Sequence, residues 1–242
     1  MRLLAVLLLA FSMNVYSEEI RVLSGGAAKS LVDPLAKSFK GATVQMDYQP
    51  MGRLVQSLKD GDAADMVIVT SEVLPTLQKE GRVAGGKGIA RVGIGVAVNE
   101  RAPSPDISTV EAFKKTLLAA KSVVYIDPKV GTSGKHVAQI LQQLGIAEEV
   151  NRKATFGQGG YITEPVGRGE IELGIHQISE ILPVKGVKLV GPLPAELQKY
   201  TVYVAAPSAR TAKKGAVDAF IAHLTGSEAK GRLEKAGYTA PE

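Results

Sequence analysis

The sequence of 242 residues contains no cysteine and only three histidines. The absence of cysteine excludes disulfides, thiolate metal sites, cysteine nucleophiles and a cysteine-linked lipid anchor. With so few histidines we expect no transition-metal site, and no motif indicates a cofactor. Gly-x-Ser-x-Gly, His-Glu-x-x-His and Walker motifs are also missing. The hydrophobic core must therefore stabilise the fold without disulfides, which a chain of this length can do.

Long hydrophobic runs are scarce as well. The run at 3–11 follows the basic start Met1-Arg2, and its nine residues fall well short of the roughly 20 that span a bilayer. A basic start, an apolar run and small residues up to Ser17 are typical of a secretory signal peptide, although a membrane anchor is the alternative. We expect residues 1–17 to be a signal peptide that is removed on export to the periplasm, and the mature chain not to be embedded in a membrane.

The formal charge of +5 is small and evenly spread. Acidic residues are interspersed with the lysines, and no basic run carries interleaved aromatics, so the sequence argues against a nucleic-acid partner. A mild positive balance is compatible with a small anionic ligand.

Apolar strand-like runs alternate with amphipathic stretches, a pattern typical of an α/β fold. Strands are predicted at 19–23, 43–48, 65–70, 89–99, 123–127, 173–177, 187–190 and 201–205. Helices are predicted at 27–39, 54–58, 74–80, 134–144, 214–224 and 228–236. A capping box of Ser108 and Glu111 predicts one further helix that ends at Ala119.

The strand-rich run at 89–99 is interpreted as a crossing between two lobes. The strand at 201–205 would be the return crossing. We therefore expect a discontinuous first lobe at 18–97 plus 206–242 and a second lobe at 98–205. The last two predicted helices should pack on the first lobe.

Candidate binding residues lie in loops that follow strands, where open α/β sheets bind their ligands. In the loop at 24–30, small residues allow backbone N–H groups to face a ligand. Lys29 could add a cation and Ser30 a hydroxyl; the alternative is a plain turn with a solvated lysine. In the loop at 127–134, Thr132 and Ser133 are either helix caps or ligand donors.

Four further side chains are candidates. His136, in the first turn of the next helix, either faces the ligand or is solvated. Tyr161 offers a phenolic hydroxyl after two glycines. Arg53 suits a carboxylate, although a surface role fits equally. Strand alternation puts His176 and Gln177 on opposite faces, so we expect only one of them to reach a cleft.

Taken together, the chain resembles the periplasmic molybdate-binding proteins. The matching segments are 22–31, 63–68, 127–134 and 167–175. The resemblance implies a type II periplasmic-binding-protein fold, in which two α/β lobes are joined by two crossing strands and hold a ligand in the cleft between them.

At several binding positions the chain departs from the family pattern, and these departures favour a ligand other than the family's oxyanion. The family holds its oxyanion with neutral donors, whereas this chain has Lys29, and Pro50-Met51-Gly52 and Gln177 stand where the family has serines and a tyrosine. A buried cation is costly unless a ligand charge offsets it, which favours a carboxylate. The motifs at 27–30, 131–134 and 177–183 are similar to a divergent branch of the family that includes aconitate isomerase.

Two functions follow from this resemblance. In the first, a monomeric binding protein closes on a di- or tricarboxylate such as aconitate and delivers it to an ABC-type permease; the binding residues would be Lys29, Ser30, Arg53, Thr132, Ser133, Tyr161 and Gln177. In the second, the chain is an aconitate isomerase, with Lys29, His136 and Tyr161 as catalytic candidates. His176 is a further candidate for moving the proton, and molybdate-type oxyanion binding is a third function.

Overall fold

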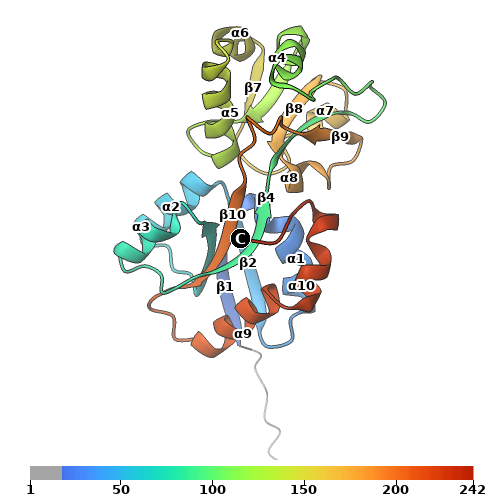
Figure 1. The fold of residues 1–242 in the computed structure, drawn as a ribbon. Coiled ribbons are helices and arrows are strands. Elements are labelled where there is room, and N and C mark those ends of the chain that lie inside the picture. Colours follow the sequence, from blue (N-terminus) through green and yellow to red (C-terminus); the bar gives the residue numbers. More distant parts are fainter. Residues whose placement is uncertain (1–17, 242) are drawn as a thin grey trace, which may run out of the picture.

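The computed structural model describes residues 18–241, so the predicted signal peptide lies outside the described residues. Two five-stranded sheets, each with helices packed around it, form two α/β lobes, as predicted. Figure 1 shows the two lobes one above the other, with β4 and β10 running toward the second lobe. Within the described range, no helix combines the length and the apolar character needed to cross a membrane.

The first sheet has the strand order β2-β1-β3-β10-β4. Its strands are β1 (Glu19–Gly25), β2 (Thr43–Gln49), β3 (Met66–Thr70), β4 (Lys87–Val92) and β10 (Thr201–Pro207). β1 pairs in parallel with β2 and β3, whereas β10 is antiparallel to β3 and β4. The helices of this lobe are η1 (Gly26–Ala28), α1 (Lys29–Ser38), α2 (Met51–Lys59), α3 (Leu74–Lys79), α9 (Lys214–Leu224), α10 (Ser227–Arg232) and η2 (Glu234–Ala236).

The second sheet has the order β7-β6-β8-β5-β9. Its strands are β5 (Ile94–Asn99), β6 (Val123–Ile126), β7 (Ala154–Gly157), β8 (Leu173–Gln177) and β9 (Val187–Pro192). Parallel pairing of β6 with β7 and β8 aligns the ends of these three strands. The helices of this lobe are α4 (Val110–Ala119), α5 (Thr132–Gln143), α6 (Ala147–Arg152), α7 (Glu164–Gly167) and α8 (Ile178–Ile181).

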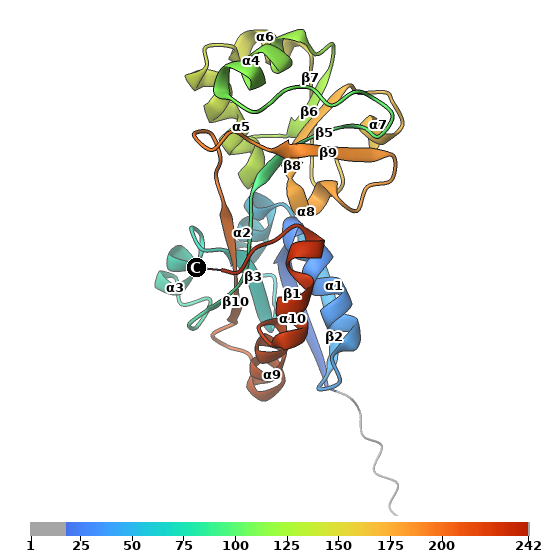
Figure 2. The same cartoon turned by 45° about the vertical axis from the view of Figure 1, so that its right-hand side comes forward.

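Two segments connect the lobes, as predicted (Figure 2). The first is the step from β4 to β5, where Gly93 separates two strands that we predicted as one. The second leads from β9 into β10 and is fastened to the first by Gln198, which accepts the N–H of Ile94 at 2.9 Å and donates to its carbonyl at 2.8 Å. The boundaries at 97/98 and 205/206 stay a prediction.

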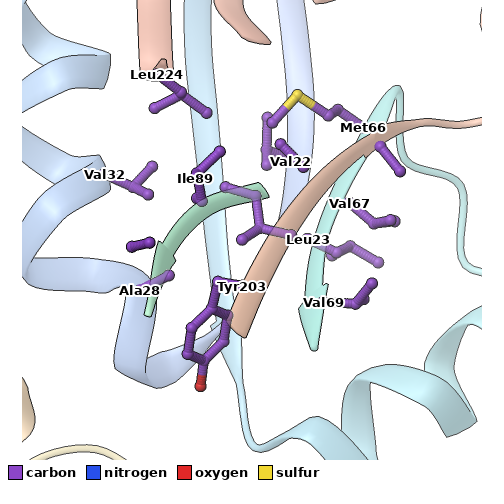
Figure 3. Packing of buried hydrophobic residues seen from close by; sticks show 14 of the residues in the cluster. Val22, Leu23, Ala28, Val32, Met66, Val67, Val69, Ile89, Tyr203 and Leu224 are labelled. Carbon is purple, nitrogen blue, oxygen red and sulfur yellow. The ribbon is translucent and has the colours of Figure 1, made fainter. Parts of the chain in front are cut away.

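Each lobe has its own hydrophobic core. In the first, Val22 of β1, Val67 of β3 and Leu224 of α9 belong to one cluster of buried residues (Figure 3). The last helices therefore pack on the first lobe, as predicted. The second core lies around Phe113 of α4 and Tyr125 of β6. Because the two cores are separate, each lobe can be stabilised internally while the contact between them changes.

The predicted capping box at Ser108 was wrong. Thr109 is the N-cap of α4, in an extended conformation, and its side chain accepts the N–H of Ala112 at 3.1 Å. The hydroxyl of Ser108 instead donates to Asp106 at 2.7 Å. Because Asp106, two residues earlier, accepts the Ser108 hydroxyl, Ser108 does not cap the helix and the next residue, Thr109, does. Four short elements were not predicted: β7, α6, α7 and α8.

Candidate functional site

A cavity of about 40 Å³ lies between the lobes, at the ends of β1, β6 and β8. The first lobe contributes Gly25, Gly26, Ala27, Pro50, Met51 and Tyr203. The second lobe contributes Ile126, Gly131, Thr132, Ser133, Gly159, Gly160, His176, Gln177 and Glu180. The cavity is therefore built from strand-end loops of both sheets, which is where we predicted a ligand site.

Several helices begin at this cavity. η1 begins at Gly26 and continues into α1, α2 begins after its N-cap Pro50, and α5 begins after its N-cap Gly131. The first N–H groups of a helix have no acceptor within the helix, and the helix dipole adds partial positive charge there. Proline and glycine have no side-chain acceptor with which to occupy those N–H groups. In α2 the N–H of Gly52 already donates to the carbonyl oxygen of Val130 at 3.1 Å, so the donors for a ligand come mainly from the starts of η1–α1 and α5. Together with the helix dipoles they make the cavity favourable for an anion.

The start of α5 depends on a glycine. A Cβ on Gly134 would lie 2.0 Å from the carbonyl oxygen of Ile126, at the end of β6. Only glycine therefore allows the first turn of α5 to lie this close to the strand. Thr132 and Ser133 are the first two residues of α5, so of the two alternatives for them the role of helix cap does not hold. Because Gly131 occupies the cap position, both side chains are free to line the cavity.

A buried histidine–carboxylate pair lies in the wall of the cavity. Nε2 of His176 is 3.0 Å from Oε2 of Glu180, and the two side chains are 2% and 9% exposed. Nε2 is also 3.2 Å from the carbonyl oxygen of Gly160, and Nδ1 is 3.3 Å from Oγ of Ser133. A carbonyl oxygen can only accept, so we place the ring hydrogen on Nε2, which leaves Nδ1 to accept the hydroxyl hydrogen of Ser133.

Gln177 and Tyr203 close another side of the cavity. The Tyr203 hydroxyl donates to Oε1 of Gln177 at 3.4 Å. Burial raises the pKa of Tyr203 well above its ordinary value, and the nearby Glu180 raises it further. Tyr203 is therefore a neutral hydroxyl. Both His176 and Gln177 line the cavity, so the prediction that only one would do so was wrong. Gln177 ends β8 and is the N-cap of α8, where strand alternation no longer applies.

The predicted binding residues fall into separate groups. Thr132, Ser133 and Gln177 line the cavity. Lys29, Ser30 and Tyr161 line a larger, open groove of about 610 Å³. Because Ala27 and Gly160 line the cavity while their near neighbours Lys29 and Tyr161 line the groove, the two spaces lie close together.

Lys29 lies between aromatic rings from both lobes. Its Nζ is 5.3 Å from the ring centroid of Tyr48 and 5.9 Å from that of Tyr161. Asp33 accepts the Tyr48 hydroxyl at 2.6 Å. Burial raises the pKa of Tyr161, and the charges of Asp33 and Glu180 raise it further, so this phenol is also neutral. Ring faces stabilise a cation without cancelling its charge, so Lys29 remains able to attract an anion.

His136 and Arg53 lie outside the cavity, and Ser30, in the groove, has a hydrogen-bond partner within the first lobe. Nε2 of His136 is 2.8 Å from the carbonyl oxygen of Leu197. Arg53 is exposed and donates to Gln158 of the second lobe at 3.3 Å. Ser30 is hydrogen-bonded to the Tyr238 hydroxyl at 2.9 Å. Within residues 18–241, neither His136 nor Arg53 belongs to the residues that line the cavity.

Sequence reasoning missed the pairing of His176 with Glu180. The two residues are four positions apart, but a strand end lies between them. In residues 18–241 no group of three or more histidine, cysteine, aspartate or glutamate residues is arranged to hold a metal ion.

Comparison with known proteins defines the family. Residues 20–239 match the model of a family described as bacterial extracellular solute-binding protein. The chain belongs to this family. An aconitate isomerase from a Pseudomonas species is 31% identical to this solute-binding protein over 232 residues, which cover 90% of this chain and 86% of that one.

Solved structures confirm the type II periplasmic-binding-protein fold. The periplasmic molybdate-binding protein of Azotobacter vinelandii superposes with a TM-score of 0.77 at 17% identity, covering 92% of this chain and 100% of that one. A sulfate-binding protein of Mycobacterium tuberculosis superposes with a TM-score of 0.73 at 18% identity, covering 93% and 88%. The predicted resemblance to molybdate-binding proteins and to the aconitate isomerase branch is confirmed.

Proposed function

We propose that this protein acts in the periplasm and binds a small di- or tricarboxylate, such as aconitate, between its two lobes. The observation that carries this proposal is the convergence of the starts of η1–α1, α2 and α5 on one interlobe cavity. Unpaired N–H groups and helix dipoles suit a carboxylate as well as an inorganic oxyanion.

Lys29 favours the carboxylate over a compact oxyanion. Its ammonium group is at the adjoining groove, away from the helix N-termini that line the cavity. A ligand with one carboxylate at the helix N-termini and another near Lys29 would satisfy both sites at once. The cavity alone, at about 40 Å³, holds only a few water-sized groups. A tricarboxylate must therefore also occupy the groove or separate the lobes.

The relatives support an anion of this kind. Proteins of the same fold are named for molybdate and sulfate. The 31% identical relative is named for aconitate, an unsaturated tricarboxylate. In our proposal Thr132, Ser133 and Gln177 contact the ligand in the cavity. Lys29, Ser30 and Tyr161 contact it from the groove, and Arg53 acts at its rim. A monomer would then deliver the ligand to an ABC-type permease.

Aconitate isomerase is the second candidate function. The identity to a named isomerase over 90% of the chain favours it, as does a cavity wall with a histidine that can exchange protons. The enzyme would bind the carboxylates with the same residues. These contacts would stabilise the negative charge that spreads into the carboxylates when a methylene proton leaves.

One experiment tests both functions. Purified protein lacking residues 1–17 is mixed with trans-aconitate and the proton NMR spectrum is followed for hours beside a heat-inactivated control. New cis-aconitate signals would establish the isomerase. Broadened ligand lines without new signals would establish a binding protein for this acid. Sharp, unchanged lines would refute the carboxylate proposal, and molybdate and sulfate would be tested next.

A further inference from the structure

We propose that Ser133, His176 and Glu180 form a proton relay that makes the cavity catalytic, with the Ser133 hydroxyl as the group that touches the substrate. This inference rests on the second candidate function, the isomerisation of aconitate. Of the sequence candidates for moving the proton, the relay uses His176 and not Lys29, His136 or Tyr161, and it adds Ser133 as the base and Glu180 as its partner.

The three side chains form a continuous chain of short contacts. Oγ of Ser133 is 3.3 Å from Nδ1 of His176, and Nε2 of the same ring is 3.0 Å from Oε2 of Glu180. All three residues line the cavity. The carbonyl of Gly160 accepts at Nε2 as well, which fixes the ring with Nδ1 toward the serine. Ser133 thus donates its hydrogen to the ring, and its oxygen lone pairs are available to the cavity.

Glu180 places a carboxylate in the wall of a cavity that favours anions. The helix N-termini favour an anion in this cavity, yet a carboxylate lies in its wall and is only 9% exposed. A Cβ on Gly26, at the start of η1, would be 3.1 Å from Oε1 of Glu180. A carboxylate that faces an anion site weakens anion binding unless it is paired with a cation. A histidine that becomes protonated during turnover provides this cation within the same cavity.

A second cluster of the same residue types shows what distinguishes the relay. Ser38, His223 and Glu228 also lie within hydrogen-bonding or ion-pair range of one another, on the outside of the first lobe. The side chains of His223 and Glu228 are 23% and 41% exposed, against 2% and 9% for His176 and Glu180. Only the buried cluster lines the interlobe cavity. The outer cluster is therefore a matched control.

The chemical step balances without a cofactor. Oγ of Ser133 takes a proton from the methylene carbon of aconitate while its own hydroxyl proton moves to Nδ1 of His176. The electron pair of the broken C–H bond spreads over the allylic carbons and their carboxylates, beside the N–H groups of α5. Nδ1 then returns its proton to Oγ, and Oγ gives its proton to the carbon at the other end of the allylic unit. The double bond has moved, and the protein is unchanged.

Glu180 is a positioning residue in this step. It holds the ring by Nε2 and stabilises the imidazolium that forms when Nδ1 takes the proton. Replacement of a group that transfers the proton typically lowers the rate by about 10²- to 10⁴-fold. Loss of Glu180 should lower the rate less, because the Gly160 carbonyl still accepts at Nε2.

The experiment compares His176→Gln, Ser133→Ala and Glu180→Gln with the control His223→Gln. Affinity for trans-aconitate is measured by calorimetry. Chemistry is measured in D₂O by NMR, as deuterium entering the methylene group and as cis-aconitate formed. Wild type and His223→Gln should exchange and isomerise equally. His176→Gln and Ser133→Ala should lose at least 100-fold in both rates. The affinity of His176→Gln should change less than tenfold, and that of Ser133→Ala should fall much less than its rates because the backbone N–H at this position remains.

Several results would overturn the relay. The first is a wild-type protein that binds trans-aconitate but shows neither deuterium exchange nor cis-aconitate formation; binding as the proposed function would then stand. The second is a folded His176→Gln protein that exchanges within threefold of wild type. Since that variant could fail to fold, Ser133→Ala, which retains the His176–Glu180 pair, supplies an independent test with the same threshold. A wild-type protein that does not bind trans-aconitate would refute the proposed function and the relay together.

Discussion

Replacement of Gly134 by alanine should disturb the fold and the anion site together. The added Cβ would lie 2.0 Å from the Ile126 carbonyl oxygen and 2.7 Å from its carbonyl carbon. Both are backbone atoms, so no side-chain rotation relieves the clash. The start of α5 must move away from β6 by about 1 Å, and overpacking of this kind costs about 1–3 kcal/mol. A loss of about 2 kcal/mol corresponds to a fall of about 4–8 °C in Tm for a chain of this size.

The same movement should weaken ligand binding. Thr132 and Ser133 begin α5 and line the cavity, so their N–H groups move with the helix. Loss of one hydrogen bond to a charged ligand costs about 1.5–3 kcal/mol. We therefore expect the affinity for trans-aconitate, measured by calorimetry, to fall at least tenfold.

Gly215→Ala is the matched control. Gly215 lies in the first turn of α9, and the space around its Cβ position is open, with nothing within 4 Å. The same substitution should stabilise the protein by up to about 1 kcal/mol and leave binding unchanged. If Gly134→Ala melts at or above the wild-type temperature and binds with unchanged affinity, the close contact of α5 with β6 does not position the anion site.

Three further predictions concern the groove, the first sheet and α4. Lys29→Met should weaken trans-aconitate binding at least tenfold by calorimetry because a charge-assisted contact is lost, whereas Lys37→Met on the exposed part of α1 should not; equal affinities would exclude Lys29 from the site. Burial raises the pKa of Asp65, but the bonds it accepts from Arg21, Lys213 and Thr211 lower it more, so the net pKa is low. Its contribution to stability is then present above the unfolded-state pKa of about 3.9 and is lost as pH falls through the lower folded-state pKa. Asp65→Asn should thus destabilise by about 1.5–3 kcal/mol in urea at pH 7 and by clearly less near pH 3; a pH-independent difference would refute the charge argument. Thr109→Ala should cost about 1 kcal/mol in the same assay, and Ser108→Ala less than half of that; the reverse order would restore the serine as the cap.

Most of the fold could be predicted from the sequence because its central strands are buried on both faces. The apolar runs at 65–70 and 123–127 predict such strands, and β3 and β6 lie there with every residue buried. β7 was missed for the opposite reason: it is an edge strand with two exposed central residues, one of them Phe156, and it shows no alternation. The four-residue helices α7 and α8 are too short to display a helical period.

The loops that form the candidate site could be predicted from the sequence, but the contacts between its side chains could not. Small residues after β1 and β6 indicate helix starts that face a ligand, and both loops line the cavity. The His176–Glu180 pair was missed because the chain changes from strand to helix between the two residues. Neither the strand period nor the helix period relates side chains across such a junction. The sequence also could not predict that Lys29 lies in a groove beside the cavity and not in the cavity itself.

The position of β10 affects the order in which the chain can fold. Every strand of the second sheet lies between Ile94 and Pro192 and can pair as soon as that stretch is available. The first sheet begins earlier in the sequence but needs Thr201–Pro207 between β3 and β4. Until that strand arrives, β3 and β4 both present open edges, which are prone to pairing with other chains. The first lobe to be synthesised is thus the last to be completed, and a chain truncated near residue 199 keeps every strand of one sheet while leaving the other split.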